Sequence, residues 1–301
     1  MNNVRTDALD CAFLAAGPPD GIPVFLVHGF PDDATTWARV IDALVAAGYR
    51  AIAPFVRGFG PTRLLPHAVR TGEIAAVAYD VLALADALGI DRFHYVGHDW
   101  GARAGYVLAS IAPERVRTLT ALAVAYGTNV AAQRLDVAQL RAYWYQWYFA
   151  TPRGVQALVS ERASFCRDLW RTWSPGWAFS DAEYDATAAS FENPDFVEIA
   201  VHSYRQRWDF SEGDPALADA RALIARVPPI GRPTTVLMGA DDGATLRASL
   251  EGTDHLFTGR YATHIVPNCG HFVQREAPDA VIGAIFAQLA NETDGTAGET
   301  P

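Results

Sequence analysis

Short apolar runs alternate with longer amphipathic segments along the first half of the chain. The apolar run at 22–27 predicts a buried strand, and the segment 37–47, whose apolar residues recur at helical spacing, predicts a helix. The alternation continues with strands predicted at 51–55, 93–96 and 119–124, and with helices predicted at 74–88 and 102–111. Strands and helices that alternate across short connections are typical of a parallel sheet covered by helices on both faces.

The same pattern returns near the C-terminus after a long interruption. Strands are predicted at 234–238 and 263–266, and a closing helix is predicted at 278–290. The polar tail at 291–301 is rich in Gly and Thr, and we expect it to be frayed.

Residues 135–220 break the alternation and are typical of helices separated by Pro and Gly. Six of the eight tryptophans of the chain fall in this segment: Trp144, Trp147, Trp170, Trp173, Trp177 and Trp208. The flanking segments, 1–134 and 221–290, are expected to form the α/β core without it. We therefore expect the insert to be a helical cap domain that covers a site on the core.

Composition narrows the class of protein and of partner. The chain has 301 residues, of which 50% are hydrophobic and 19% charged, as expected of a folded globular protein. Its net charge is −10 and it contains no Lys/Arg-rich run, so we expect no nucleic-acid partner. Three widely spaced cysteines, Cys11, Cys166 and Cys269, fit neither a disulfide framework nor a zinc site. Without an apolar leader or a membrane-length apolar run, the sequence predicts a cytoplasmic protein that does not bind membranes.

A Gly-rich turn, GHDWG at 97–101, joins a predicted strand to a predicted helix. A nucleophile between glycines at such a place forms a nucleophile elbow, a strained turn that exposes its side chain at the carboxyl edge of the sheet. Asp99 occupies the nucleophile position, and a carboxylate there forms an ester with an alkyl carbon. The alternative is an aspartate that only caps the helix N-terminus.

The loop HGFP at 28–31 follows the strand predicted at 22–27. In this architecture such a loop brings a backbone N–H towards the elbow, so Phe30 and Trp100 are expected to supply the two N–H groups of an oxyanion hole. His28 is expected to brace the loop. The alternative is an ordinary Gly-Pro turn.

The acid and the histidine are expected to follow the nucleophile in that order. His271 lies just past the last predicted strand, and the other histidines fit this place less well. Two acids, Asp241 and Asp242, follow the strand predicted at 234–238. Their spacing from Gly239 favours Asp242, with Asp241 as the alternative.

These motifs resemble those of the α/β-hydrolase-fold epoxide hydrolases, and the resemblance extends over residues 20–290. It is carried by HGFP at 28–31, GHDWG at 97–101 and CGH at 269–271. It implies the α/β-hydrolase fold, with a mostly parallel central sheet flanked by helices and an inserted helical cap. It also implies hydrolysis of an epoxide without a metal or organic cofactor.

Two segments of the insert resemble the lid-tyrosine motifs of the same family: YQWYF at 145–149 and HSYR at 202–205. In that family two phenols hydrogen-bond the oxirane oxygen and protonate the leaving alkoxide, which implies this role for Tyr145 and Tyr204. A phenol suits the task because, with an ordinary pKa of about 10, it stays protonated at neutral pH. The alternatives are an aromatic helix face for Tyr145 and a core position for Tyr204.

The resulting mechanism has two stages. Asp99 attacks an epoxide carbon to form an ester, and His271, oriented by Asp242, then activates the water that hydrolyses it. The aromatic insert favours an aromatic or bulky apolar epoxide as the small-molecule substrate. The expected pocket residues are aromatic: Trp37, Trp144, Trp147 and Phe272. A monomer or a homodimer is expected.

Other functions remain open. Haloalkane dehalogenases share the Asp nucleophile and the position of Trp100, but usually have Asn where this chain has Phe30. Fluoroacetate-type haloacid dehalogenases usually have Arg where this chain has Trp100. Arg103 matches a second Arg of their pattern, although a charge on the helix face is the simpler interpretation. A protein that binds a small ligand without turnover is the alternative from another class.

Overall fold

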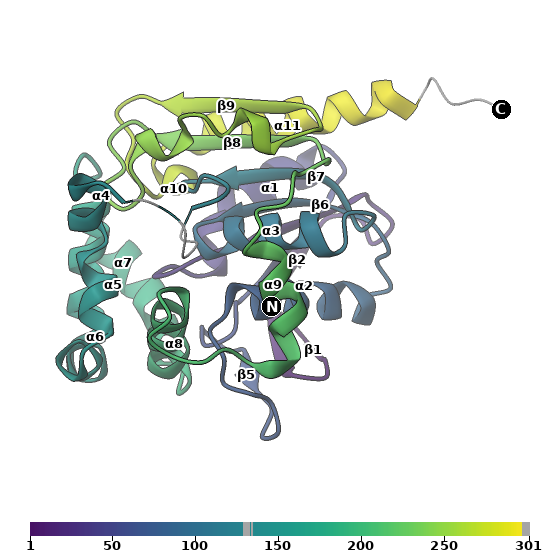
Figure 1. Ribbon diagram of the computed structural model, residues 1–301. Coiled ribbons are helices and arrows are strands. Elements are labelled where there is room, and N and C mark those ends of the chain that lie inside the picture. Colours follow the sequence, from purple (N-terminus) through teal and green to yellow (C-terminus); the bar gives the residue numbers. More distant parts are fainter. Residues whose placement is uncertain (129–132, 134, 297–301) are drawn as a thin grey trace.

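A largely parallel sheet forms the centre of the computed structural model, which describes residues 1–128, 133 and 135–296 (Figure 1). The nine-stranded sheet found in this part of the chain has the order β1-β2-β4-β3-β6-β7-β8-β9, with β5 paired to β2 beside that path. The strands span Asn2–Arg5 (β1), Leu9–Ala16 (β2), Pro23–Val27 (β3), Arg50–Pro54 (β4), Arg63–Leu64 (β5), Phe93–His98 (β6), Val116–Leu122 (β7), Thr234–Gly239 (β8) and Tyr261–Val266 (β9). The predicted mostly parallel α/β architecture is confirmed.

The parallel strands, from β4 to β9 along the sheet, coincide with the predicted apolar runs. In β3, Val24 and Leu26 pack into one core cluster, while Phe25 and Val27 pack into the other. A strand with both faces buried needs apolar residues at every position, which is why its sequence is a continuous run.

The N-terminal strands differ from the prediction, which placed no strand before residue 22. β1 pairs antiparallel with β2, and β2 pairs antiparallel with β4. β1 is mostly polar and exposed, and β2, its neighbour in the sequence, pairs on its other side with the distant β4. Their pairing is therefore decided by tertiary contacts.

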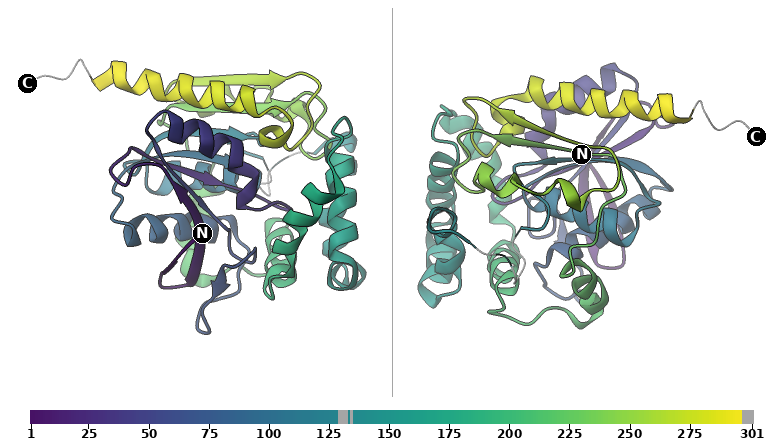
Figure 2. Two further views of the ribbon diagram at one scale, coloured as in Figure 1. Left: turned by 180° about the vertical axis from the view of Figure 1, so that it is seen from behind. Right: turned by 45° about the horizontal axis from the view of Figure 1, so that its top comes forward.

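Two helical layers cover the sheet. On one face α1 (Ala38–Ala46) packs beside α11 (Pro278–Thr296), as the left view of Figure 2 shows. On the other face α2 (Ile74–Ala87) and α9 (Ala218–Ile224) both contact α3 (Trp100–Ile111). Shorter helical segments lie in the connections: Ala34–Trp37, Ala189–Glu192, Pro215–Leu217, Arg247–Leu250, Asp254–Leu256 and Val273–Glu276 (α10). In the described parts of the chain, no helix combines the length and the apolar character needed to cross a bilayer.

The predicted frayed tail from Asn291 is wrong as far as Thr296, because α11 continues to that residue. Residues 291–296 are polar but contain no Pro, and the one glycine, Gly295, lowers helix stability without removing a backbone hydrogen bond. The remainder of the predicted tail, 297–301, lies outside the described residues.

The cap helices lie beyond the carboxyl ends of the parallel strands (Figure 1). They span Val137–Ala142 (α4), Trp144–Phe149 (α5), Pro152–Trp173 (α6), Asp181–Ala188 (α7) and Phe196–Arg207 (α8). Polar caps mark three of their starts: Asp136 accepts from the Gln139 N–H, Thr151 from the Gly154 N–H, and Ser180 from the Glu183 N–H. The boundary expected at 220 falls inside α9, which packs on α3 of the core; the boundary expected at 134 lies outside the described residues.

The cap is tied to the loop that follows β3. The Trp170 indole N–H donates to the Pro31 carbonyl oxygen at 2.7 Å. The buried guanidinium of Arg275 binds Asp32 of this loop at 2.5 Å and Glu183 of the cap at 3.3 Å. Ser190 of the cap donates to Asp33 at 2.5 Å. These contacts fix the loop that carries Phe30 between the sheet and the cap.

Candidate active site

Asp99 lies in a strained turn between β6 and α3. Its backbone has φ 49° and ψ −110°, a conformation that a non-glycine residue rarely adopts. A Cβ atom on Gly101 would lie 2.0 Å from the Val27 carbonyl oxygen, so only glycine allows the helix to approach β3 this closely. The Asp99 carboxylate makes no capping hydrogen bond to α3, which rules out the helix-cap alternative.

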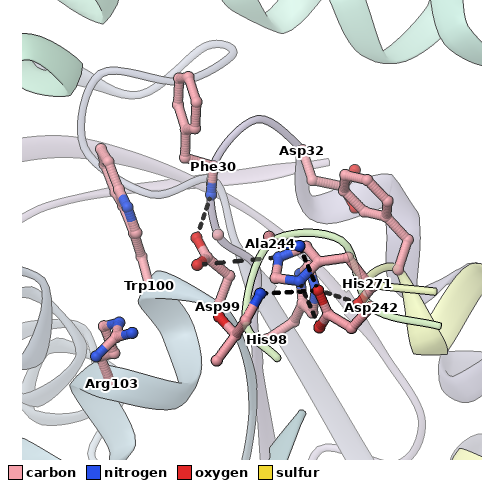
Figure 3. Close-up of polar contacts among 12 residues, drawn as sticks. Phe30, Asp32, His98, Asp99, Trp100, Arg103, Asp242, Ala244 and His271 are labelled. Atoms are coloured by element: carbon pink, nitrogen blue, oxygen red, sulfur yellow. Dashed lines mark hydrogen bonds and ion pairs between the residues drawn. The ribbon is translucent and has the colours of Figure 1, made fainter. Parts of the chain in front are cut away.

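One carboxylate oxygen of Asp99 is held by the loop after β3 (Figure 3). The backbone N–H of Phe30 donates to Asp99 Oδ1 at 3.0 Å. A Cβ atom on Gly29 would lie 2.6 Å from the Trp100 backbone N and 2.7 Å from Asp99 Oδ1. Of the two N–H groups expected in an oxyanion hole, that of Phe30 binds the carboxylate, and the Trp100 backbone N lies beside the same glycine. His28 braces this loop, because its Nε2 accepts from the Val56 N–H at 3.0 Å.

Asp242 and His271 form a buried pair at the ends of β8 and β9. His271 Nδ1 lies 2.9 Å from Asp242 Oδ2, while Asp242 Oδ1 accepts from the backbone N–H groups of Ala244 and Thr245 at 2.7 and 2.9 Å. Asp241 is exposed. The structure therefore pairs His271 with Asp242, the residue that the spacing favoured.

The imidazole of His271 faces Asp99. Its Nε2 lies 4.0 Å from Asp99 Oδ2 and, among the described residues, has no hydrogen-bond partner (Figure 3). Burial alone would lower the pKa of His271, but the charge and hydrogen bond of Asp242, with a contribution from Asp99, raise it above its ordinary value. His271 Nε2 is therefore available to accept a proton from a water molecule beside Asp99.

Neighbouring groups orient His271 from its backbone side. Its N–H donates to Ser174 Oγ at 2.9 Å, and its carbonyl oxygen lies 3.0 Å from His98 Nε2. Burial lowers the pKa of His98 to about 3, so this ring is neutral at pH 7. A neutral imidazole whose Nε2 meets a carbonyl must carry its hydrogen there, so His98 donates a hydrogen bond to the loop that carries His271. Ser174 and His98 were not predicted from the sequence in this role.

The two lid phenols come from α5 and α8 and meet above Asp99. Tyr145 and Tyr204 are buried, with ring centroids 5.2 Å apart at 87°. Burial raises the pKa of both phenols, and the nearby Asp99 carboxylate raises each further. Both phenols therefore remain protonated over the ordinary pH range.

A continuous set of aromatic rings surrounds these groups. The Phe30 ring lies 5.7 Å from Trp100, 5.4 Å from Tyr204 and 6.2 Å from Phe149. Trp173 lies 4.9 Å from Tyr145 and 5.0 Å from His271. Phe149 and Trp173 were missed, although Phe149 is one helical turn after Tyr145 and shares its helix face.

Of the four expected pocket residues, only Phe272 adjoins the catalytic groups, with its ring 5.4 Å from His271. Trp37 is a wrong prediction: it is buried in the core cluster that also holds Val281 of α11. Trp144 is 42% exposed and lies on the outer side of α5, and the ring of Trp147 lies 4.8 Å from that of Trp208 at a tilt of 44°. All three lie at helical spacings that are equally consistent with core, surface or pocket positions.

Arg103 was expected to be a charge on the exposed face of its helix, but its side chain is buried. It is 9% exposed and donates to the carbonyl oxygen and Oγ1 of Thr128 at 3.0 and 3.1 Å. It lines a cavity of about 220 Å³ whose walls include neither Asp99 nor His271. Within the part of the chain that the structure describes, no three His, Cys, Asp or Glu side chains group as metal ligands would.

Comparisons with known proteins show which families the chain is similar to. A family model described as the alpha/beta hydrolase fold matches residues 22–278. Epoxide hydrolase B of Mycobacterium tuberculosis (strain ATCC 25618 / H37Rv) is 32% identical and covers 88% of this chain and 91% of its own. The crystal structure of a candidate epoxide hydrolase from Klebsiella pneumoniae subsp. pneumoniae superposes with a TM-score of 0.91 at 36% identity, covering 95% of this chain and 96% of that one. Fluoroacetate dehalogenase of Burkholderia sp is 36% identical over 66% of this chain and 60% of its own.

Proposed function

Because the chain belongs to the epoxide hydrolase family of the α/β-hydrolase fold, we propose that it converts an epoxide to a vicinal diol through a covalent ester on Asp99. The observation that carries this mechanism is a carboxylate at a strained elbow, facing a buried pair of neutral phenols. The carboxylate is a nucleophile towards alkyl carbon, and the phenols are acids for the oxygen that leaves.

In the first stage, Asp99 Oδ2 attacks one epoxide carbon while the Phe30 N–H holds Oδ1. A C–O bond forms between the carboxylate and this carbon, and the bond from the same carbon to the oxirane oxygen breaks. Tyr145 and Tyr204 donate hydrogen bonds to the oxirane oxygen, and one of them transfers its proton to the alkoxide. The product of this stage is a hydroxyalkyl ester of Asp99.

In the second stage, His271 Nε2 takes a proton from water, and the resulting hydroxide attacks the Asp99 ester carbonyl. Asp242 stabilises the imidazolium through the Nδ1–H. The backbone N–H groups of Phe30 and Trp100 stabilise the oxyanion, a contribution worth about 10²- to 10³-fold in rate for each donor. The ester breaks as the imidazolium proton passes to the leaving alkoxide, and the diol leaves. Asp99 keeps one oxygen from water, and the proton of its new carboxyl group returns to the tyrosine phenolate, which restores the starting state.

A single turnover in H₂¹⁸O tests the covalent intermediate. With enzyme in excess over styrene oxide, the first diol is expected to contain unlabelled oxygen, because that oxygen comes from Asp99. The label should instead appear in Asp99, where peptide mass analysis detects it. Prompt incorporation of label into the first diol would mean direct attack by water on the epoxide and would sink the proposal.

Dehalogenation is the second candidate, supported by the Burkholderia relative and by the same Asp99 nucleophile. The paired phenols favour the epoxide, because a departing halide needs no proton whereas an alkoxide does. Parallel assays of halide release from fluoroacetate and from short haloalkanes, and of diol formation from epoxides, separate the two. Halide release without diol formation would make the protein a dehalogenase.

The two stages should respond differently to pH. Ester hydrolysis needs neutral His271, whose pKa lies above the ordinary 6.5, so its rate is expected to fall as pH drops below a midpoint higher than 6.5. Ester formation needs protonated phenols. Because the pKa values of both phenols are raised, the rate of ester formation should not decline near neutral pH. Stopped-flow measurement of each stage between pH 5 and about 10 checks both limbs. Asp242→Asn should move the acidic limb of hydrolysis to lower pH, while Asp241→Asn should leave it in place.

A further inference from the structure

A phenol carries one hydrogen, and it can donate to an epoxide only if that hydrogen is not already used by the protein. Other buried tyrosines of this chain do use it, each donating to a backbone carbonyl oxygen: Tyr95, Tyr106, Tyr126 and Tyr184. Tyr145 and Tyr204 do not: in the described chain, no carbonyl or carboxylate oxygen accepts from either phenol. The hydrogens of these two hydroxyl groups are therefore available to a substrate, and their direction depends on the groups that bind the hydroxyl oxygens.

The hydroxyl of Tyr145 ends a short chain of hydrogen bonds that starts at Trp208. The Trp208 indole N–H donates to Gln146 Oε1 at 2.7 Å, and Gln146 Nε2 lies 2.8 Å from the Tyr145 hydroxyl oxygen. An indole N–H can only donate, so it must face the amide oxygen, and the amide NH₂ must then face the phenol. An NH₂ group cannot accept a hydrogen bond, so the Tyr145 oxygen is the acceptor and its own hydrogen points elsewhere.

The hydroxyl of Tyr204 is held in the same way by a different residue. The Trp100 indole N–H lies 3.3 Å from the Tyr204 hydroxyl oxygen. The indole again can only donate, so the Tyr204 oxygen accepts and keeps its hydrogen for another partner. Both phenols thus receive one hydrogen bond from a group that cannot take their hydrogen.

We propose that Trp208, Gln146 and Trp100 are positioning residues that direct the O–H hydrogens of Tyr145 and Tyr204 at the oxirane oxygen. The inference rests on the proposed function. It identifies the groups that keep both phenols oriented as hydrogen-bond donors. Gln146 is 1% exposed, so bulk solvent does not reach its amide, and Trp208 fixes which end of that amide meets the phenol. Each N–H also stabilises the phenolate left after proton transfer, which strengthens the phenol as an acid.

Gln146→Glu tests the proposal because it reverses the direction of one hydrogen bond. An ionised carboxylate at this place is expected to accept the Tyr145 hydrogen and turn it away from the substrate. Ester formation from styrene oxide, followed by rapid quench and intact mass, should slow by about 10²-fold, the lower end for loss of a general acid. The defect should shrink as pH falls and the new carboxyl group becomes protonated, while ester hydrolysis should keep the wild-type rate.

Trp208→Phe provides a second test that retains an aromatic ring and removes only the N–H that fixes the amide. Its ester formation is expected to slow by about 10-fold, again without an effect on ester hydrolysis. Trp177→Phe is the matched control, because Trp177 is a cap tryptophan that packs on Trp170 and belongs to neither set of hydrogen bonds. It should form the ester at the wild-type rate.

The outcomes distinguish this inference from the function on which it rests. If the wild-type protein forms no ester, the proposed function fails. If it does, and both Gln146→Glu and Trp208→Phe form the ester at the wild-type rate, only the positioning role fails. Equal slowing of ester formation and ester hydrolysis would indicate a general structural defect and would also overturn it. Thermal melting identifies a variant that does not fold, in which case the other variant decides.

Discussion

Replacement of His271 by glutamine is expected to stop turnover after the ester has formed. The first stage needs only Asp99 and the two phenols, so it should proceed at close to the wild-type rate. The second stage loses its base, and ester hydrolysis should slow by about 10⁴- to 10⁶-fold, as in other triads that lack a member. Intact mass spectrometry should show the whole protein population heavier by the mass of one epoxide, and peptide analysis should place that mass on Asp99.

A matched control for this variant is His264→Gln. His264 is exposed on β9, the same strand whose end leads to His271, so the same chemical change there should leave no trapped ester. An epoxide-dependent mass increase on any residue other than Asp99, or a His271→Gln protein that turns over at the wild-type rate, would contradict the assignment of these two residues.

Asp99→Asn is expected to abolish turnover while leaving the fold and the site intact. An amide oxygen can still accept the Phe30 N–H, but the side chain no longer carries the anionic oxygen that attacks carbon. Diol formation should fall by about 10⁵-fold or more, a loss similar to that of a nucleophile in other triads. No ester mass should appear, and the variant should still bind an epoxide, as calorimetry can measure.

The stability of Asp99→Asn provides an independent check. Asn tolerates a positive φ better than most residues, and the change removes a buried charge, so the melting temperature should be equal to or higher than that of the wild type. Asp241→Asn makes the same substitution at an exposed position and should retain full activity. A wild-type protein that binds epoxides but never turns them over would instead support a ligand-binding role.

Much of the core followed from local sequence patterns. Strand β3 is buried on both faces and is a continuous apolar run, and β6 and β8 are buried along their length with only His or Thr among their apolar residues. The elbow could be predicted because the backbone approaches so closely around the strained turn at Asp99 that only glycine fits at positions 97 and 101. The N-terminal strands could not be predicted, because β1 is mostly polar and no local pattern shows that β2 pairs with the distant β4.

The cap was the least predictable part of the site. Its many tryptophans indicated that it covers the core, but not which of the rings face the site and which face solvent. Trp173 and Phe149 line the site, whereas Trp144 lies half exposed on the outer side of its helix. Spacing along a helix defines its faces, but the packing of that helix decides which face meets the substrate.

The sequence by itself determined the types of catalytic group and their order along the chain, because parallel strands bring residues at their carboxyl ends to one edge of the sheet. Only the tertiary structure decided which groups touch. It paired His271 with Asp242 and left Asp241 exposed, and it placed the Trp208 indole behind Tyr145 through Gln146. These contacts join residues from different helices and loops. Hydrogen-bond partners of this kind depend on how those elements pack against one another, which local sequence patterns do not encode.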